Sequence, residues 1–191
     1  PLVTLELARL WANVIPDGVL NVIVGTGSGA GESMIHHPGI DKFSFTGSTK
    51  VGRHIGEVTG GNIIPCTLEL GGKSANIVFR DAQLDRALQF SMLAILATQG
   101  EVCVGGSRLL LHESIYDEFL ERLRVKFEAL RVGDPLDPAT QIGPLVSRAQ
   151  MEKVLDYIES GKAEGARLVC GGGRYTENGC ENGYFVKPTL F

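Results

Sequence analysis

The sequence predicts an α/β fold built on a parallel sheet. Short β-rich runs alternate with segments whose apolar residues recur at helical spacing, and Gly-rich turns separate several of them. Strands that are joined through helices pair in parallel, because each helix carries the chain back across the sheet. We therefore expect a Rossmann-like parallel sheet at residues 1–70, followed by part of a second α/β domain at residues 71–191.

The first half of the chain has the order α, β, α, β, α, β. A helical pattern opens it, with Leu5 and Trp11 on the apolar side, and a Gly-rich loop from Gly25 to Gly31 leads into a short helix that ends before Pro38. Ser48 is a suitable N-cap for a helix that ends at Gly60-Gly61. The strands expected here are 20–24, 42–46 and 66–70.

The second half continues the alternation. A strand at 75–79 precedes a long helix at about 82–98, for which Asp81 is the expected cap. A strand at 108–112 is followed by a helix starting at Ser114, with Asp117 completing a capping-box pattern, and a last helix starts at Ser147 and Gln150. Further strands are expected at 167–170 and 184–191.

Composition excludes several classes of protein. The 191 residues are 43% hydrophobic with a net charge of −4, which is ordinary for a globular protein and gives no basic field for nucleic acid. No apolar run reaches the roughly 20 residues that a membrane span needs. The four cysteines form no C-x-x-C pair, which favours a reduced, cytoplasmic setting.

Both ends of the chain fall inside expected elements. Pro1 leads directly into a helical pattern, and Phe191 ends what reads as a strand. Domains rarely start and stop within packed elements, because flanking chain normally covers them. We therefore expect the sequence to be a central fragment of a longer protein.

Two glycine-containing segments are candidates for binding an anion. Gly25, Gly27 and Ala30 fit G-x-G-x-x-A, a weak dinucleotide pattern that an ordinary tight turn also explains. Gly47-Ser48 opens a helix whose free N–H groups can bind an anion, although a simple capped helix has the same pattern. A P-loop at Gly72-Lys73-Ser74 fails, since Thr67 stands where that motif needs glycine.

Glu69 and Cys103 are the candidates for chemistry. Glu69 stands between Leu68 and Leu70 at a strand end, so it either faces water or is held in a cleft for proton transfer. Cys103 follows a long helix in a Gly-rich stretch, where it is either a nucleophile or a small packed side chain. The four histidines show no metal-ligand spacing, and no metal site is expected.

Three motifs together resemble the NAD(P)-dependent aldehyde dehydrogenase superfamily. Residues 45–52 (FTGSTKVG) are similar to its cofactor motif, residues 68–74 (LELGGKS) to its glutamate signature, and residues 100–103 (GEVC) to its cysteine signature. Glu69 precedes Cys103 by 34 positions. The resemblance covers essentially the whole chain and favours the catalytic alternatives for Glu69 and Cys103.

The resemblance implies a covalent oxidation of an aldehyde to a carboxylic acid with NAD or NADP. Cys103 would form a thiohemiacetal and then a thioester, and Glu69 would activate the hydrolytic water. The cofactor-binding candidates are Gly25, Gly47, Ser48, Gly52 and Leu70. A small-molecule aldehyde would be the substrate, and the full-length protein would form a homodimer or homotetramer, with the helix after Ser48 at the dimer interface.

The sequence departs from the family pattern at Glu101, where Gln is commoner, and at Thr98, where many relatives have Asn. The family's upstream oxyanion Asn, ribose-contacting Lys and downstream Glu have no counterpart here, so the chain alone is expected to be inactive. A non-catalytic structural relative and a plain nucleotide-binding module are the alternatives. Neither the aldehyde nor the choice between NAD and NADP can be read from these residues.

Overall fold

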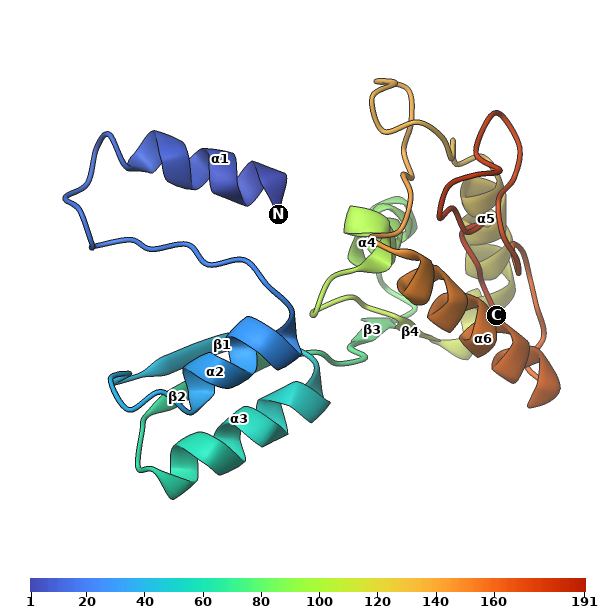
Figure 1. Ribbon diagram of the computed structural model, residues 1–191. Helices are drawn as coiled ribbons and strands as arrows, with labels where there is room; N and C mark the ends of the chain where they lie inside the picture. The colour runs from blue at the N-terminus through green and yellow to red at the C-terminus, as the bar shows by residue number, and fades with distance from the viewer. The chain divides into compact units, whose positions relative to one another are not determined.

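The computed structural model describes all 191 residues, which form two compact units, Pro1–Gly71 and Gly72–Phe191. Each unit contains its own pair of parallel strands joined through a helix (Figure 1). No helix is long and apolar enough to cross a membrane. The mixed α/β architecture with parallel strands confirms the predicted fold class.

The first unit is a β-α-β arrangement preceded by short helices. Its elements are α1 (Leu2–Trp11), a π-helical turn η1 (Gly27–Gly31), α2 (Glu32–Ile35), β1 (Phe43–Gly47), α3 (Thr49–Gly61) and β2 (Cys66–Leu70). β1 and β2 pair in parallel, with Phe43 opposite Cys66 and Gly47 opposite Leu70. Ile35, Phe43 and Ile55 are buried together, so α2 and α3 pack on the same face of the sheet.

The second unit repeats the β-α-β arrangement and adds two helices. Its elements are β3 (Ala75–Val78), α4 (Leu84–Leu96), the 3₁₀ turn η2 (Ala97–Gly100), β4 (Arg108–Leu111), the 3₁₀ turn η3 (Glu113–Ile115), α5 (Tyr116–Glu128) and α6 (Arg148–Ala163). β3 and β4 pair in parallel. The core lies where α4 and α5 meet, with Leu88 and Phe119 fully enclosed.

Three predicted strands are wrong. Residues 20–24 have no strand partner, and residues 167–170 and 184–191 contribute only isolated bridges, Cys170 with Leu190 and Arg174 with Val186. A β-rich run becomes a strand only when a neighbouring segment supplies a continuous hydrogen-bonding edge, and local composition does not reveal that partner.

Two predicted helix caps are also wrong. Gln83 rather than Asp81 stands at the N-cap of α4, without a side-chain hydrogen bond. The helix expected at Ser114 starts as η3, where His112 Nδ1 accepts from the Ser114 N–H, and α5 follows from Tyr116. The caps predicted at Ser48 and Ser147 are confirmed, since each hydroxyl accepts from a backbone N–H three residues on.

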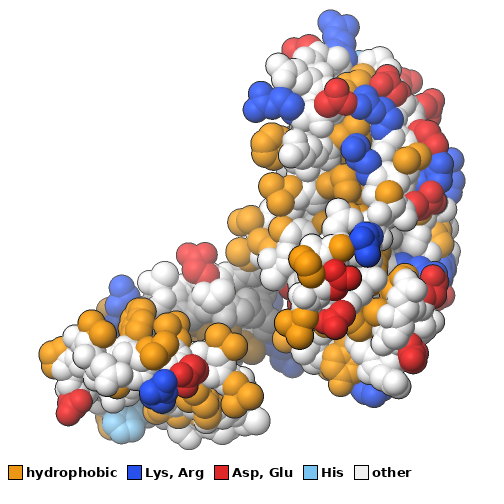
Figure 2. Space-filling model, turned by 90° about the horizontal axis from the view of Figure 1, so that it is seen from above, with side chains coloured by type: hydrophobic (Ala, Val, Ile, Leu, Met, Phe, Trp, Pro, Cys, Tyr) orange, Lys and Arg blue, Asp and Glu red, His pale blue; other side chains and the backbone are white.

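Each unit has large apolar side chains exposed on its surface (Figure 2). In the second unit, Ile77 and Leu110 lie opposite each other on the open face of the β3–β4 sheet, 60% and 49% exposed. Exposed apolar patches on a folded protein mark surfaces that pack against something else.

Candidate active site

The carboxyl end of β1 leads into α3 at the predicted cofactor motif. Ser48 caps α3, its Oγ lying 3.3 Å from the Val51 N–H that donates to it. The first turn of α3 contains no acidic residue, and the N–H groups of Thr49 and Lys50 precede the first intrahelical hydrogen bond, from Gly52 to Ser48. An uncompensated helix N-terminus of this kind attracts phosphate oxygens.

Close packing requires glycine at two positions of this motif. A Cβ on Gly47 would overlap the ring of Phe45, and a Cβ on Gly52 would lie 2.5 Å from Leu70 Cδ2. Gly47 pairs with Leu70 across the sheet. The structure thus brings together four of the predicted cofactor residues, Gly47, Ser48, Gly52 and Leu70, at one end of the sheet.

Gly25 lies in a separate loop and packs within it. A Cβ there would lie 2.8 Å from Ala30 Cβ, so the tight turn itself requires glycine. Thr26 accepts a hydrogen bond from the Gly29 N–H, which caps η1. The strand expected before this loop is absent, so Gly25 lacks half of the strand–turn–helix context of a dinucleotide fingerprint.

Glu69 occupies the penultimate position of β2, opposite Thr46 of β1. Leu68 and Leu70 are half-buried on the face that α3 covers, so alternation puts Glu69 on the other face. Within the first unit that face is polar and exposed, and it also carries Ser44, Thr46 and Thr67. The carboxylate is therefore accessible to water at the same sheet end as the cofactor motif.

Cys103 belongs to the second unit and is exposed in a turn between α4 and β4. The turn is closed by the Gly105 N–H donating to Val102 O at 3.1 Å, and the Gly106 N–H donates to Ala94 O of α4 at 2.9 Å. The N–H groups of Cys103 and Val104 donate to no acceptor in the protein. The turn therefore presents a thiol beside free hydrogen-bond donors, as oxyanion stabilisation requires.

Close packing at Gly106 fixes this turn against its unit. A Cβ on Gly106 would lie 3.2 Å from Ala94 Cβ and 3.3 Å from Asn76 Cβ, so the backbone passes closely between α4 and β3. Asn76 Nδ2 in turn donates to Ser91 Oγ at 2.9 Å, which holds β3 against α4. Close contacts on both sides of the backbone keep the turn in place.

Three consecutive residues with left-handed backbone precede the cysteine, and the sequence analysis did not predict them. Thr98, Gln99 and Gly100 have φ of 52°, 56° and 79°. This conformation is unusual for a β-branched residue such as Thr98 and costs of order 1–3 kcal/mol for each such residue. The nearest sequence signal is Gly100, which tolerates positive φ.

The other cysteines differ from Cys103 in exposure. Cys170 and Cys180 are buried, and burial raises the pKa of both thiols, so they stay protonated. Cys66 is exposed at the start of β2. Exposure alone therefore leaves Cys66 and Cys103 as the reactive candidates.

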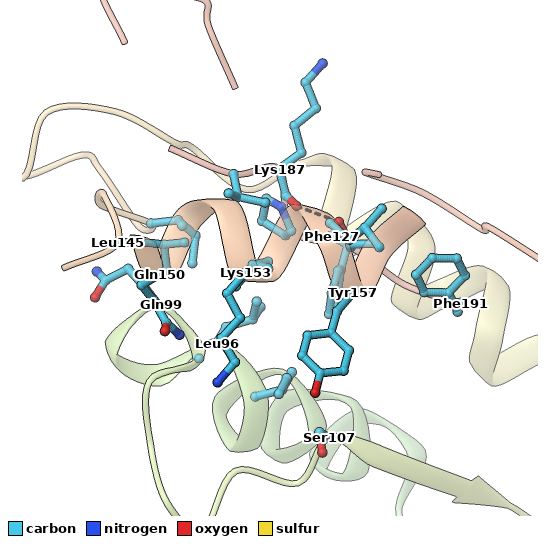
Figure 3. A pocket seen from close by; sticks show the side chains of 18 of the residues that line it. Leu96, Gln99, Ser107, Phe127, Leu145, Gln150, Lys153, Tyr157, Lys187 and Phe191 are labelled. Carbon is cyan, nitrogen blue, oxygen red and sulfur yellow. Dashed lines mark hydrogen bonds between the residues drawn. The ribbon is translucent and has the colours of Figure 1, made fainter. Parts of the chain in front are cut away.

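A cavity of about 530 Å³ lies in the second unit beside the cysteine turn. Gln99, Gly100 and Ser107 line it and flank the turn in sequence, whereas Cys103 is not among its lining residues. Figure 3 shows Lys153 and Tyr157 reaching from α6 into the cavity toward Leu96 and Ser107. The cavity thus separates α6 from the end of α4.

The chain is similar to several solved structures, aldehyde dehydrogenases among them. PnpE from Pseudomonas sp. WBC-3 is 42% identical with a TM-score of 0.96, and the match covers 99% of this chain and 39% of that one. An NAD⁺ complex of aldehyde dehydrogenase from Bacillus cereus is 41% identical (TM-score 0.95, 99% and 38%). An NAD⁺ complex of betaine aldehyde dehydrogenase from Staphylococcus aureus is 35% identical (TM-score 0.95, 99% and 38%).

These matches cover nearly all of this chain but only about two fifths of each solved chain. The sequence model of the aldehyde dehydrogenase family matches residues 1–191. The chain therefore belongs to the aldehyde dehydrogenase family.

Proposed function

We propose that this chain is the central part of an NAD(P)-dependent aldehyde dehydrogenase that oxidises an aldehyde to a carboxylic acid. The observation that carries the proposal is the match of the family model to the whole chain, which includes Cys103 in an ordered turn. Residues 1–70 would belong to the cofactor-binding domain and residues 71–191 to the catalytic domain. Because the chain spans 38–39% of its solved relatives, we expect no useful turnover from it alone.

The residues at the carboxyl end of β1 fit a dinucleotide. Gly47 and Gly52 keep the backbone free of side chains there, and the N-terminus of α3 offers unpaired N–H groups to a pyrophosphate. The solved relatives from Bacillus cereus and Staphylococcus aureus bind NAD⁺, which supports NAD as the cofactor. When bound, the nicotinamide accepts a hydride from the substrate carbon.

Cys103 would be the nucleophile. Its thiolate sulfur forms a bond to the aldehyde carbon, and the carbonyl electrons move to oxygen, where the free N–H of Cys103 can donate to the oxyanion. Loss of hydride from that carbon reforms the carbonyl as a thioester. The Cys103 sulfur stays bonded to the acyl carbon until water displaces it.

Glu69 would be the general base for hydrolysis. Its carboxylate takes a proton from the attacking water, the new C–O bond forms, and the C–S bond breaks to release the acid and the Cys103 thiolate. The accessible polar face of β2 gives water access to this carboxylate. The separated cysteines favour a cytoplasmic setting, and the resemblance favours a homodimer or homotetramer with α3 at the dimer interface.

The test uses the complete enzyme that contains this chain. With NAD⁺ and an aldehyde, Cys103→Ser should abolish NADH formation, whereas Glu69→Gln should give a burst of about one NADH per active site and then stall. Mass spectrometry of the stalled enzyme should find the acyl group on Cys103. Glu152→Gln, which changes an exposed carboxylate on α6, is the matched control and should turn over normally.

Full steady-state turnover by Glu69→Gln would contradict the role of Glu69, and turnover by Cys103→Ser would contradict the covalent route.

Iodoacetamide labelling distinguishes this enzyme from a non-catalytic relative. Cys66 and Cys103 are both exposed, so accessibility predicts equal labelling and only chemical activation favours Cys103. Equal labelling would support the non-catalytic alternative.

A further inference from the structure

A cluster of three metal-ligating side chains lies in the first unit, at the junction of α2 and α3. Glu32 begins α2, His36 stands at its C-cap, and His54 belongs to α3. His36 Nε2 lies 3.0 Å from Glu32 Oε1, and His54 Nε2 lies 3.0 Å from Glu32 Oε2. One nitrogen or oxygen from each residue falls within 4.8 Å of the others.

The packing beneath the cluster fixes its geometry. Glu32 and His36 are four residues apart, so one helical turn places them on the same face. Ile35 of α2 and Ile55 of α3 are buried together directly beside His36 and His54 in sequence. Two helices that share a core in this way hold the three side chains close together without help from a ligand.

The donor atoms and their spacing suit a transition-metal ion. Two imidazoles and one carboxylate are the protein ligands of well-known zinc sites that leave a position open for water. Ligands about 2.0–2.1 Å from a tetrahedral ion stand about 3.3 Å apart, close to the observed 3.0 Å separations. Within this chain the side chains are 43–56% exposed, so water can complete the coordination of an ion.

The charge of the cluster also favours a metal cation. Glu32 is an acidic side chain, so the cluster contains one anionic ligand for a cation. Both imidazoles direct Nε2 at the same carboxylate rather than at separate partners. An ion entering between them replaces the Nε2 protons, which leave to solvent or move to Nδ1.

We propose that Glu32, His36 and His54 form a binding site for a divalent transition-metal ion of the Zn²⁺ class, with water completing the coordination. The site lies on α2 and α3, the helices that cover one face of the β1–β2 sheet. It uses none of the residues assigned to the cofactor or to the aldehyde chemistry. Its role is to join α2 to α3, because an ion shared by both helices stabilises their packing. The proposal does not depend on the proposed oxidation.

The test is a titration of the metal-free protein with Co²⁺ and Zn²⁺ after Cys66 and Cys103 are alkylated, because exposed thiols also bind these ions. One Co²⁺ per chain should bind, with visible absorption of a low-coordinate site and no thiolate charge-transfer band. His36→Gln and His54→Gln should each weaken binding about tenfold or more. His37→Gln is the matched control, since His37 is adjacent in sequence and contacts the Gly39 N–H instead.

A second measurement avoids variants altogether. In the wild-type protein, Zn²⁺ should shift the ring-nitrogen NMR signals of His36 and His54 and leave those of His37 and His112 in place. Stoichiometric binding that survives both glutamine variants, or ring signals that do not move at millimolar Zn²⁺, would overturn the site. The cluster would then be a pair of ordinary surface hydrogen bonds.

Discussion

Two glycines of α3, one turn apart, differ in what a Cβ would meet. At Gly52 it would lie 2.5 Å from Leu70 Cδ2, whereas at Gly56 it would lie 3.7 Å from Leu68 Cδ1, an ordinary contact. Replacing a helical glycine with alanine normally stabilises a protein by roughly 0.5–1 kcal/mol. The packing around each position therefore decides whether alanine raises or lowers the free energy of unfolding.

We predict that Gly56→Ala raises the free energy of unfolding by about 0.5–1 kcal/mol and that Gly52→Ala lowers it by about 1–3 kcal/mol. The second change forces Leu70 out of its position against α3. Urea unfolding followed by circular dichroism measures both variants against the wild type. Equal stabilisation by the two substitutions would show that Leu70 moves aside freely.

Residue-scale predictions from sequence succeed where the reason is local. Ser48 and Ser147 cap helices because a hydroxyl just before an amphipathic run can reach the N–H three residues on. The left-handed Thr98 and Gln99 have no such local cause, because the packing of the cysteine turn determines their backbone. The sequence does not predict the cluster of Glu32, His36 and His54, because His54 comes from a different helix. Only the four-residue spacing of Glu32 and His36 can be read from the sequence.

At the scale of elements, α6 depends on its first turn. Ser147 Oγ accepts from the Gln150 N–H at 3.2 Å, and Ser147 O accepts from the Met151 N–H at 3.0 Å. We predict that Ser147→Ala lowers the free energy of unfolding by about 1 kcal/mol, because the Gln150 donor loses its acceptor.

The control for this prediction is on the same helix. Ser160 near the end of α6 donates only to the exposed Glu164 carboxylate, so Ser160→Ala should stay within about 0.5 kcal/mol of the wild type. Thermal or urea unfolding of the two variants under identical conditions makes the comparison. Equal losses would mean that the cap hydrogen bond contributes nothing specific.

A strand was predicted correctly where its pairing partner lies close to it in the sequence. The strand at 66–70 was predicted with its observed ends, because β1, α3 and β2 form one continuous β-α-β unit. The strand expected at 20–24 fails because no segment pairs with it, and the strand expected at 184–191 fails because it forms only isolated bridges, with Cys170 and Arg174. Strand formation depends on a second segment, and one local window of sequence does not contain that information.

At the scale of the whole molecule, each unit has its own hydrophobic core. Ile35, Phe43 and Ile55 form the core of the first unit, and the second unit is built around Leu88 and Phe119 with a smaller cluster at Val132 and Ile142. No residue of either unit's clusters belongs to the other unit. We therefore expect a substitution in one core to destabilise the unit to which that core belongs.

Hydrogen exchange with mass spectrometry tests this independence. We predict that Phe119→Ala, which empties a fully buried site, lowers the free energy of amide opening by about 3–5 kcal/mol in α4 and α5 and leaves α3 unchanged. Ile55→Ala should have the reciprocal effect, with faster exchange in α2, α3, β1 and β2 and no change in the second unit. Val125→Ala, at a half-exposed position on α5, controls for the substitution itself and should change neither. Faster exchange in both units from either core variant would mean that the two cores open as one cooperative structure, because then destabilising one would expose the amides of both.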